Sequence, residues 1–205
     1  GIRLIMIYDL LPSAVKFSLG HLFSYRLLLK DYPLKEHEFV HINLKFHPKI
    51  ATENGSINVT TIGSKKGNTT DILLTKNDER GNEIWYKKFG GSSYDKASSI
   101  IDTEDGFLII GSTSSYGNGN YDFYVIKTDK NGKKVWQNTY GDFYNEYGYS
   151  AEKTKQGFII KGTKQNCPNN TDINRKCTTN VWFVSIDENG RQVSNQLLEE
   201  IPNLY

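Results

Sequence analysis

The segment HEFVH, residues 37–41, is the one stretch whose residue types have the spacing of a known catalytic centre. On a helix, His37 and His41 would lie one turn apart and bind zinc, and Glu38 would activate a zinc-bound water. His47 stands at the spacing of a third ligand. The segment therefore raises the alternative of a zinc metallopeptidase with His37, His41 and His47 as metal ligands.

The residues around this segment argue against zinc. Val40, Ile42, Leu44 and Phe46 alternate with polar residues, which is the period of a strand. Leu44 also stands where such enzymes have a glycine, and no methionine follows Met6 to form their methionine turn. We therefore predict a strand here, with no catalytic residues, no metal and no cofactor in the protein.

The rest of the chain offers few groups for catalysis. All four histidines, at positions 21, 37, 41 and 47, precede residue 50, and no glycine-rich phosphate loop precedes a helix. Three acidic segments, DERGN, DKNGK and DENGR, share a pattern with parts of calcium loops but lack the further oxygen ligands and the closing glutamate. Asp and Asn side chains stabilise turns through their own backbone, and we assign these acids to turns.

The elements that must position any site come from a repeat of about 50 residues, a period typical of solenoids, propellers and arrays. The same residue types return in register: Trp85 with Trp136, Gly90 with Gly141, Gly63 with Gly111 and Gly162, and the hairpin glycines Gly81, Gly132 and Gly190, each three residues after an aspartate. Because packing recurs with a fold and a catalytic site rarely does, we expect Trp85 and Trp136 to pack against a neighbouring unit.

Each unit reads as four short strands. In the central unit these are residues 96–103, 107–111, 121–128 and 133–140, with turns at Asp105-Gly106 and at 129–132. Asp-Gly and Asn-Gly between apolar runs predict hairpins with type I′ turns. Residues 107–110 are apolar without alternation, which predicts a strand covered on both faces.

This pattern resembles the β-propeller repeats of secreted and surface-attached bacterial proteins. The segment TDKNGKKVW, residues 128–136, is similar to the tryptophan-docking segment of quinoprotein-like propellers. The match is good over residues 90–141, fair over 50–89 and weaker over 142–196, where Ser194 replaces the tryptophan and Ser185 replaces the lysine found at 76 and 127. The resemblance implies a fold and carries no catalytic residues.

The predicted fold class is therefore all-β, a β-propeller of four-stranded antiparallel blades. Three blades are recognisable, at about 45–89, 90–140 and 141–196 within a domain of residues 45–205. Residues 1–44 form a divergent N-terminal segment: a degenerate blade, a cap or part of a neighbouring domain. Since propellers typically have four to eight blades, we expect a partner subunit or missing blades to complete the ring; the alternative is a compact four-blade ring that uses residues 1–49.

Composition limits the partners and the compartment. The net charge of the 205 residues is +2 with acids and bases interspersed, which gives no electrostatic case for nucleic acid, and no apolar run is long enough for a membrane-spanning helix. Cys167 and Cys177, the only cysteines, bracket the longest loop. We predict a disulfide bond between them, which implies an oxidising compartment, extracellular or in the cell envelope.

A ligand would find aromatic side chains on one loop face. In a propeller, the loop between blades shares a face with the loop between the second and third strands. The aromatic residues expected there are Tyr94, Tyr116, Tyr121, Phe143, Tyr144, Tyr147 and Tyr149. Either they pack between blades or some of them bind a protein or glycan partner. The leading hypothesis is a non-catalytic binding or scaffold propeller, with a zinc metallopeptidase or a glycan-active propeller enzyme as the alternative.

Overall fold

A computed structural model describes residues 49–63, 67, 69–166 and 177–198. These residues form twelve strands in three four-stranded antiparallel sheets and contain no helix, which confirms the all-β class for this part of the chain. Accordingly, no helix of the length and hydrophobicity needed to cross a membrane occurs within it.

Each sheet is a simple meander in which strands that follow one another in the chain pair side by side. The first sheet contains β1 (Lys49–Thr52), β2 (Gly55–Gly63), β3 (Thr70–Asn77) and β4 (Glu83–Phe89). The second contains β5 (Asp95–Thr103), β6 (Gly106–Thr113), β7 (Asp122–Asp129) and β8 (Lys134–Tyr140). The third contains β9 (Asn145–Thr154), β10 (Gly157–Asn166), β11 (Thr178–Ile186) and β12 (Gln192–Leu198).

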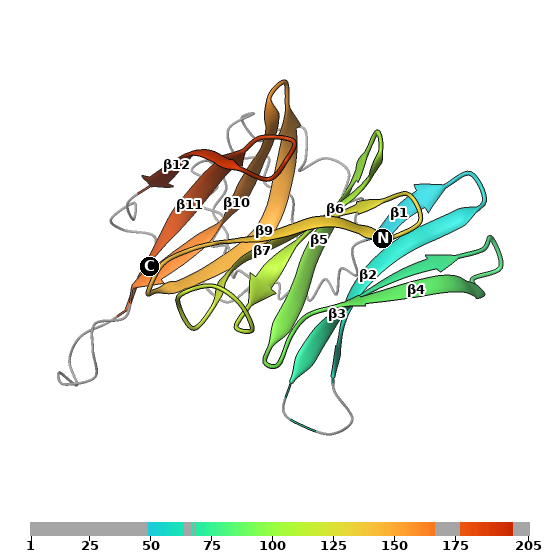
Figure 1. Ribbon diagram of the computed structural model, residues 1–205, viewed down its shortest axis with the longest axis horizontal. Coiled ribbons are helices and arrows are strands. Elements are labelled where there is room, and N and C mark those ends of the chain that lie inside the picture. Colours follow the sequence, from blue (N-terminus) through green and yellow to red (C-terminus); the bar gives the residue numbers. More distant parts are fainter. Residues whose placement is uncertain (1–48, 64–66, 68, 167–176, 199–205) are drawn as a thin grey trace, which may run out of the picture.

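The sheets follow one another across the molecule in chain order (Figure 1), and the second packs between the other two. The first strand of a sheet makes the contact with the sheet before it: β5 touches β2 and β3, and β9 touches β6 and β7. The three sheets do not close into a ring, so a closed propeller is not what the described residues form.

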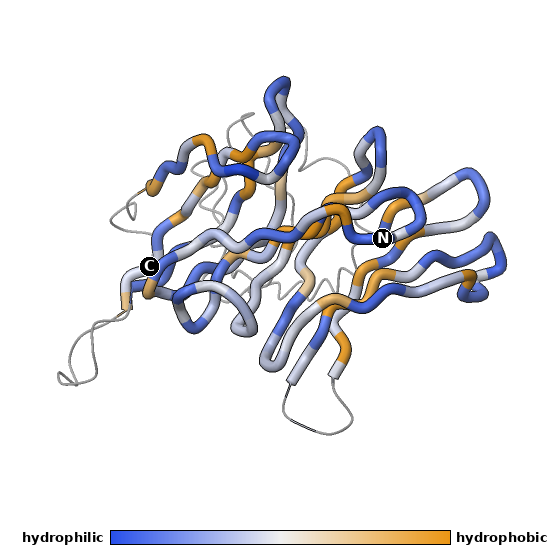
Figure 2. Tube along the Cα trace, in the orientation of Figure 1, coloured by the Kyte–Doolittle hydropathy of each residue, from blue (hydrophilic) through white to orange (hydrophobic). Residues whose placement is uncertain are grey.

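Strand β6 shows why the central sheet has apolar residues on both faces. All eight of its residues are buried. Phe107 and Ile109 belong to the core shared with the first sheet, whereas Leu108 and Ile110 belong to the core shared with the third. The prediction of a strand covered on both faces is confirmed. Hydrophobic stretches accordingly gather where the sheets meet, and the hairpin turns are hydrophilic (Figure 2).

The three Asp-x-x-Gly turns have one geometry. In the second sheet, the Gly132 N–H donates to the Asp129 carbonyl at 3.1 Å, and Oδ1 of Asp129 accepts from the N–H groups of Asn131 and Lys133. The turns at Asp78 and Asp187 repeat all three bonds. The acids therefore stabilise turns, as predicted.

The expected type I′ geometry is wrong for these turns. The hydrogen bond places the glycine at the fourth position of the turn, where it has a positive φ of 74° to 86°. This geometry is that of a type I turn followed by a left-handed residue, and the strand pairing next to each turn contains a bulge. Only the glycine takes this left-handed conformation at low cost. The three-residue spacing from Asp to Gly, rather than the Asn-Gly pair, was the informative signal.

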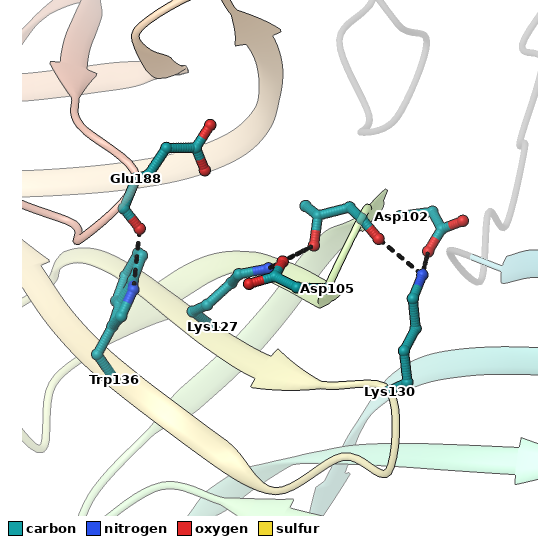
Figure 3. A network of polar contacts seen from close by, with 7 residues as sticks. Asp102, Asp105, Lys127, Lys130, Trp136 and Glu188 are labelled. Atoms are coloured by element: carbon teal, nitrogen blue, oxygen red, sulfur yellow. Dashed lines mark hydrogen bonds and ion pairs between the residues drawn. The ribbon is translucent and has the colours of Figure 1, made fainter.

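The tryptophans lock one sheet to the next at these glycines. A β-carbon on Gly132 would lie 2.8 Å from the ring of Trp85, and one on Gly190 would lie 2.8 Å from the ring of Trp136, so each indole lies directly on the turn of the following sheet. The indole N–H of Trp136 also donates to the Glu188 carbonyl at 3.3 Å (Figure 3). The expected packing against a neighbouring unit is confirmed, with both rings half-buried.

A buried lysine braces the second sheet from within. The side chain of Lys127 is 3% exposed; its amino group donates to the Thr103 hydroxyl and forms an ion pair with Asp105 (Figure 3). The hydrogen bond from Lys127 holds the pKa of Asp105 below its ordinary value. In the third sheet, Ser185 takes the place of this lysine, and the brace is missing there.

Gly132 and Gly81 form a matched pair for testing the lock. Both have positive φ, but no described residue lies within 4 Å of a β-carbon built on Gly81. Gly81→Ala should therefore cost only backbone strain, on the order of 1 kcal/mol, whereas Gly132→Ala should cost about 1–3 kcal/mol more because the methyl group meets the Trp85 ring. Denaturant unfolding measures both, and equal losses would show that the ring does not press on the turn.

Candidate functional site

One face of the molecule is built from three loops, at residues 90–94, 114–121 and 141–144; we call it the loop face. The loops between sheets reach it through parallel bridges, one joining Thr70 to Tyr94 and one joining Tyr121 to Asn145. The Glu146 N–H donates to the Tyr121 carbonyl at 2.7 Å. The second-to-third-strand loop and the inter-sheet loops therefore lie side by side.

The loop at 114–121 connects the two junctions. On one side, the Tyr116 hydroxyl donates to the Gly90 carbonyl at 2.7 Å, and a β-carbon on Gly91 would lie 2.6 Å from Ser115. On the other side, a β-carbon on Gly119 would lie 2.2 Å from the Tyr144 carbonyl oxygen. These close approaches require glycine, and they hold all three loops against one another.

The predicted aromatic residues divide into two groups. Tyr94, Tyr116 and Tyr144 are exposed by 37–38%, and Phe143 is exposed by 85%. Tyr121, Tyr147 and Tyr149 are half-buried: the first two pack ring to ring at 5.3 Å, and the Tyr149 hydroxyl lies 3.0 Å from the Thr163 hydroxyl. The first group is available to a ligand, whereas the second supports the face from below.

A buried aspartate organises the junction between the first and second sheets. Asp95 is fully buried; its carboxylate accepts hydrogen bonds from the Gly91 N–H at 2.8 Å, the Ser115 hydroxyl at 2.7 Å and the Thr113 hydroxyl. A β-carbon on Gly90 would lie 2.3 Å from the carboxylate of Asp71 and 2.7 Å from that of Asp95, and Asp71 pairs with Lys88 at 2.7 Å. The hydrogen bonds and the ion pair of these two buried carboxylates therefore hold the loop and its glycines in position.

The junction between the second and third sheets repeats this arrangement with more charge. Asp122 and Glu146 flank Gly141: a β-carbon there would lie 2.2 Å from one carboxylate and 2.5 Å from the other. Lys164 forms an ion pair with Asp142 and lies 3.5 Å from Oε1 of Glu146. Two carboxylates thus share one lysine, and the carboxylate of Asp122 lies close to that of Glu146.

The burial and close spacing of these carboxylates raise the pKa values of Glu146 and Asp122. Burial raises the pKa of Glu146 to about 7; the charge of Lys164 opposes the rise and that of Asp142 adds to it. Burial also raises the pKa of Asp122, against the backbone N–H groups of Gly119 and Asn118. Oε1 of Glu146 has no hydrogen-bond partner among the described residues. At neutral pH the junction therefore holds a carboxyl group close to its titration point.

Sequence reasoning missed these buried acids, although the signal was present. Asp71 and Asp122 lie 51 positions apart, as do Asp95 and Glu146, so both pairs follow the repeat. Their recurrence at two junctions assigns them to the fold rather than to catalysis. Within residues 49–63, 67, 69–166 and 177–198, no group of three acidic, histidine or cysteine side chains is arranged to hold a metal ion.

Other predicted site residues lie outside the described part of the chain. His37, His41 and His47 precede β1, so the zinc alternative stays a prediction. Cys167 also falls outside it, while Cys177 is exposed immediately before β11, so the disulfide stays a prediction as well.

Comparison with known proteins adds no identity to this picture: no protein-family model and no curated protein sequence matches the chain.

The raised pKa of Glu146 predicts how stability depends on pH. The folded protein holds this proton up to a pKa of about 7, whereas the unfolded chain releases it near 4.5, so the wild type loses stability as pH rises between these values. Glu146→Gln removes that loss and keeps an acceptor for the Asp142 N–H. Its unfolding free energy relative to wild type should therefore grow by about 1–3 kcal/mol from pH 4.5 to pH 8.

Denaturant titrations at several pH values test this expectation. Glu152→Gln is the matched control, because Glu152 lies on the same strand but its side chain is 63% exposed. The control should change stability by a similar small amount at every pH. A Glu146→Gln difference that stays constant with pH would contradict the burial of an ionisable group at this junction.

Proposed function

We propose that the protein is a non-catalytic binding or scaffold module that uses its loop face to bind a protein or glycan partner. The observation that carries this proposal is the set of four exposed aromatic side chains on one buried polar framework. Tyr and Phe rings provide broad contact area at small entropic cost, and aromatic residues are enriched in recognition surfaces.

The framework makes this surface suitable for recognition. The Tyr116 hydroxyl is tied to the Gly90 carbonyl, and Lys164 lies over the Tyr144 ring, with its amino group 5.2 Å from the ring centre. A ring held in one place loses less entropy on binding than a free one. Phe143, at the tip of the third loop, is the most exposed ring and is the expected first contact with a ligand.

The proposal extends to architecture. Three sheets with the same strand order, joined by the same tryptophan lock, are what blades of a β-propeller would look like, and we propose that further blades or a partner subunit complete the ring. A surface-attached or secreted protein of the cell envelope would fit this architecture, the predicted Cys167–Cys177 disulfide and a ligand outside the cell. The completed ring, the disulfide and the location outside the cell are proposals that rest on the resemblance to β-propeller repeats and on the repeat of about 50 residues.

A measurement of zinc content distinguishes the enzyme hypothesis from the binding hypothesis. The described residues contain no histidine, so a zinc peptidase would depend on His37, His41 and His47, and a glycan-active enzyme would have to use carboxylates that recur at both junctions as part of the fold. Stoichiometric zinc in the purified protein would reverse the order of the two hypotheses.

Removing the exposed rings tests the proposal. Phe143→Ala combined with Tyr144→Ala should lower binding to a glycan array or to cell-surface proteins at least tenfold, with only a small change in melting temperature, because Phe143 is 85% exposed and Tyr144, which contacts Lys164, is 38% exposed. Tyr86→Ala is the control, since Tyr86 is 58% exposed but lies on β4, away from the loop face. Undiminished binding by the loop variant would contradict the assignment of this face.

A further inference from the structure

We infer that the turn at Asp78–Gly81 is an open docking site for a tryptophan carried by a strand of another polypeptide. This surface is separate from the loop face. The inference rests on a comparison of three equivalent turns in one molecule: two are covered by an indole ring, and the third is covered by no residue that the structure describes.

The two covered turns define what docking requires. In the third sheet, Trp136 lies on Gly190, its indole N–H donates to the Glu188 carbonyl at 3.3 Å, and the side chains of Asn138 and Tyr140 donate to the Gly190 carbonyl at 2.8 Å and 2.6 Å. Alternate residues of a single strand, β8, therefore supply every contact. Gly132 shares the ring contact: a β-carbon there would lie 2.8 Å from the ring of Trp85 and 2.9 Å from the side chain of Lys87, and both covered glycines are buried.

The first turn has the same internal geometry, but no described residue covers it. Gly81 has a φ of 86°, its N–H donates to the Asp78 carbonyl at 3.0 Å, and Oδ1 of Asp78 accepts from the N–H groups of Arg80 and Asn82. Gly81 is nevertheless exposed, and no described residue lies within 4 Å of the position that a ring would contact. Its carbonyl accepts a bond from the Asn77 side chain at 3.2 Å, so the turn keeps its shape without a partner.

A groove on the outer face of the first sheet leads to this turn. Its volume is 540 Å³, and its lining includes Thr75, Asn77, Glu79 and Gly81. Three acids, Glu53, Asp78 and Glu79, line it against one base, Lys49. The negative charge favours a strand with basic residues beside its aromatic one.

The polar lining of the groove indicates that the partner strand binds without a large apolar interface. In the second sheet, Phe107, Ile109 and Ile126 face the preceding sheet. The corresponding positions of the first sheet carry Ser56, Asn58 and Thr75, which line the groove. Burying these polar groups requires a partner that hydrogen-bonds with them, so the occupant is a polar strand whose main apolar contact is the indole.

None of the tryptophans within the 205 residues is free to cover this turn. Its three tryptophans are Trp85 and Trp136, which cover turns, and Trp182, which is buried in the core of the third sheet. Residues 1–48 contain none, and the strand that a second copy would offer from its last sheet carries Ser194 at that position. The ring must therefore come from outside these 205 residues, and we assign it to another polypeptide.

A peptide titration followed by NMR tests the inference on the full chain. The probe is KKVWQNTYG, residues 133–141, which is the strand that covers Gly190 and has two lysines next to its tryptophan. At millimolar concentration it should shift the amide signals of Gly81 and Glu79 and leave those of Gly132 and Gly190 in place. The same peptide with alanine in place of Trp136 should produce less than a tenth of the shift.

Two variants test whether the negative charge of the groove contributes to peptide binding. Glu79→Lys should weaken peptide binding at least threefold, whereas Glu104→Lys, the same charge change on an exposed turn outside the groove, should leave it unaltered. The inference is overturned by no shift at Gly81, by an equal shift with the alanine peptide, or by a native mass of two chains with the Gly81 amide already protected, which would mean that a second copy covers the turn.

Discussion

The structure depends on one steric constraint, the left-handed glycine that ends each Asp-x-x-Gly turn. Because a glycine has no side chain, an indole from the preceding sheet can lie directly on the backbone, as Trp85 does on Gly132 and Trp136 does on Gly190. The aspartate fixes the turn by accepting two backbone N–H groups, so the shape of the surface that the ring meets is set by bonds within the turn itself. Sheet order, spacing and orientation follow from this contact together with the apolar residues between the sheets.

The opposite end of each junction is held by charge rather than by an aromatic ring. Asp95 and Glu146 are fully buried, and each accepts the N–H group of the loop that enters its sheet. An unpaired buried carboxylate is costly, so these side chains enforce one loop conformation. The exposed rings of the loop face therefore stand on a rigid base. The two ends have different tasks: the turn end assembles sheets, and the loop end presents side chains to a ligand.

Much of the fold was readable from the sequence because the fold repeats. The period of about 50 residues, the turn glycines and the alternation-free run 107–110 predicted four-stranded units, their stacking and the role of Trp85 and Trp136. The turn type was misjudged, since Asn-Gly suggested type I′ while the aspartate three residues before the glycine determines the hydrogen bonds. The candidate site was less accessible: exposure separates Phe143 from Tyr147, and exposure depends on which loops meet.

Acids at a period of 51 were visible, but their burial was not, since Asp and Glu are usually exposed and only the junction geometry removes them from water. Nor could the sequence show that the first sheet turns a polar face outward, because the residues there read as an ordinary alternating strand. Pairing between distant segments decides both properties, and no local pattern records it.

Hydrogen exchange at the three turn glycines tests the central claim most directly. Their amides make the same hydrogen bond, at 3.0 Å in Gly81 and Gly190 and at 3.1 Å in Gly132, so differences in exchange report on what covers them. The account predicts that the Gly132 and Gly190 amides exchange at least tenfold more slowly than the Gly81 amide, because a ring must leave before they open. Equal exchange at all three would contradict the claim that tryptophan on glycine holds the sheets together.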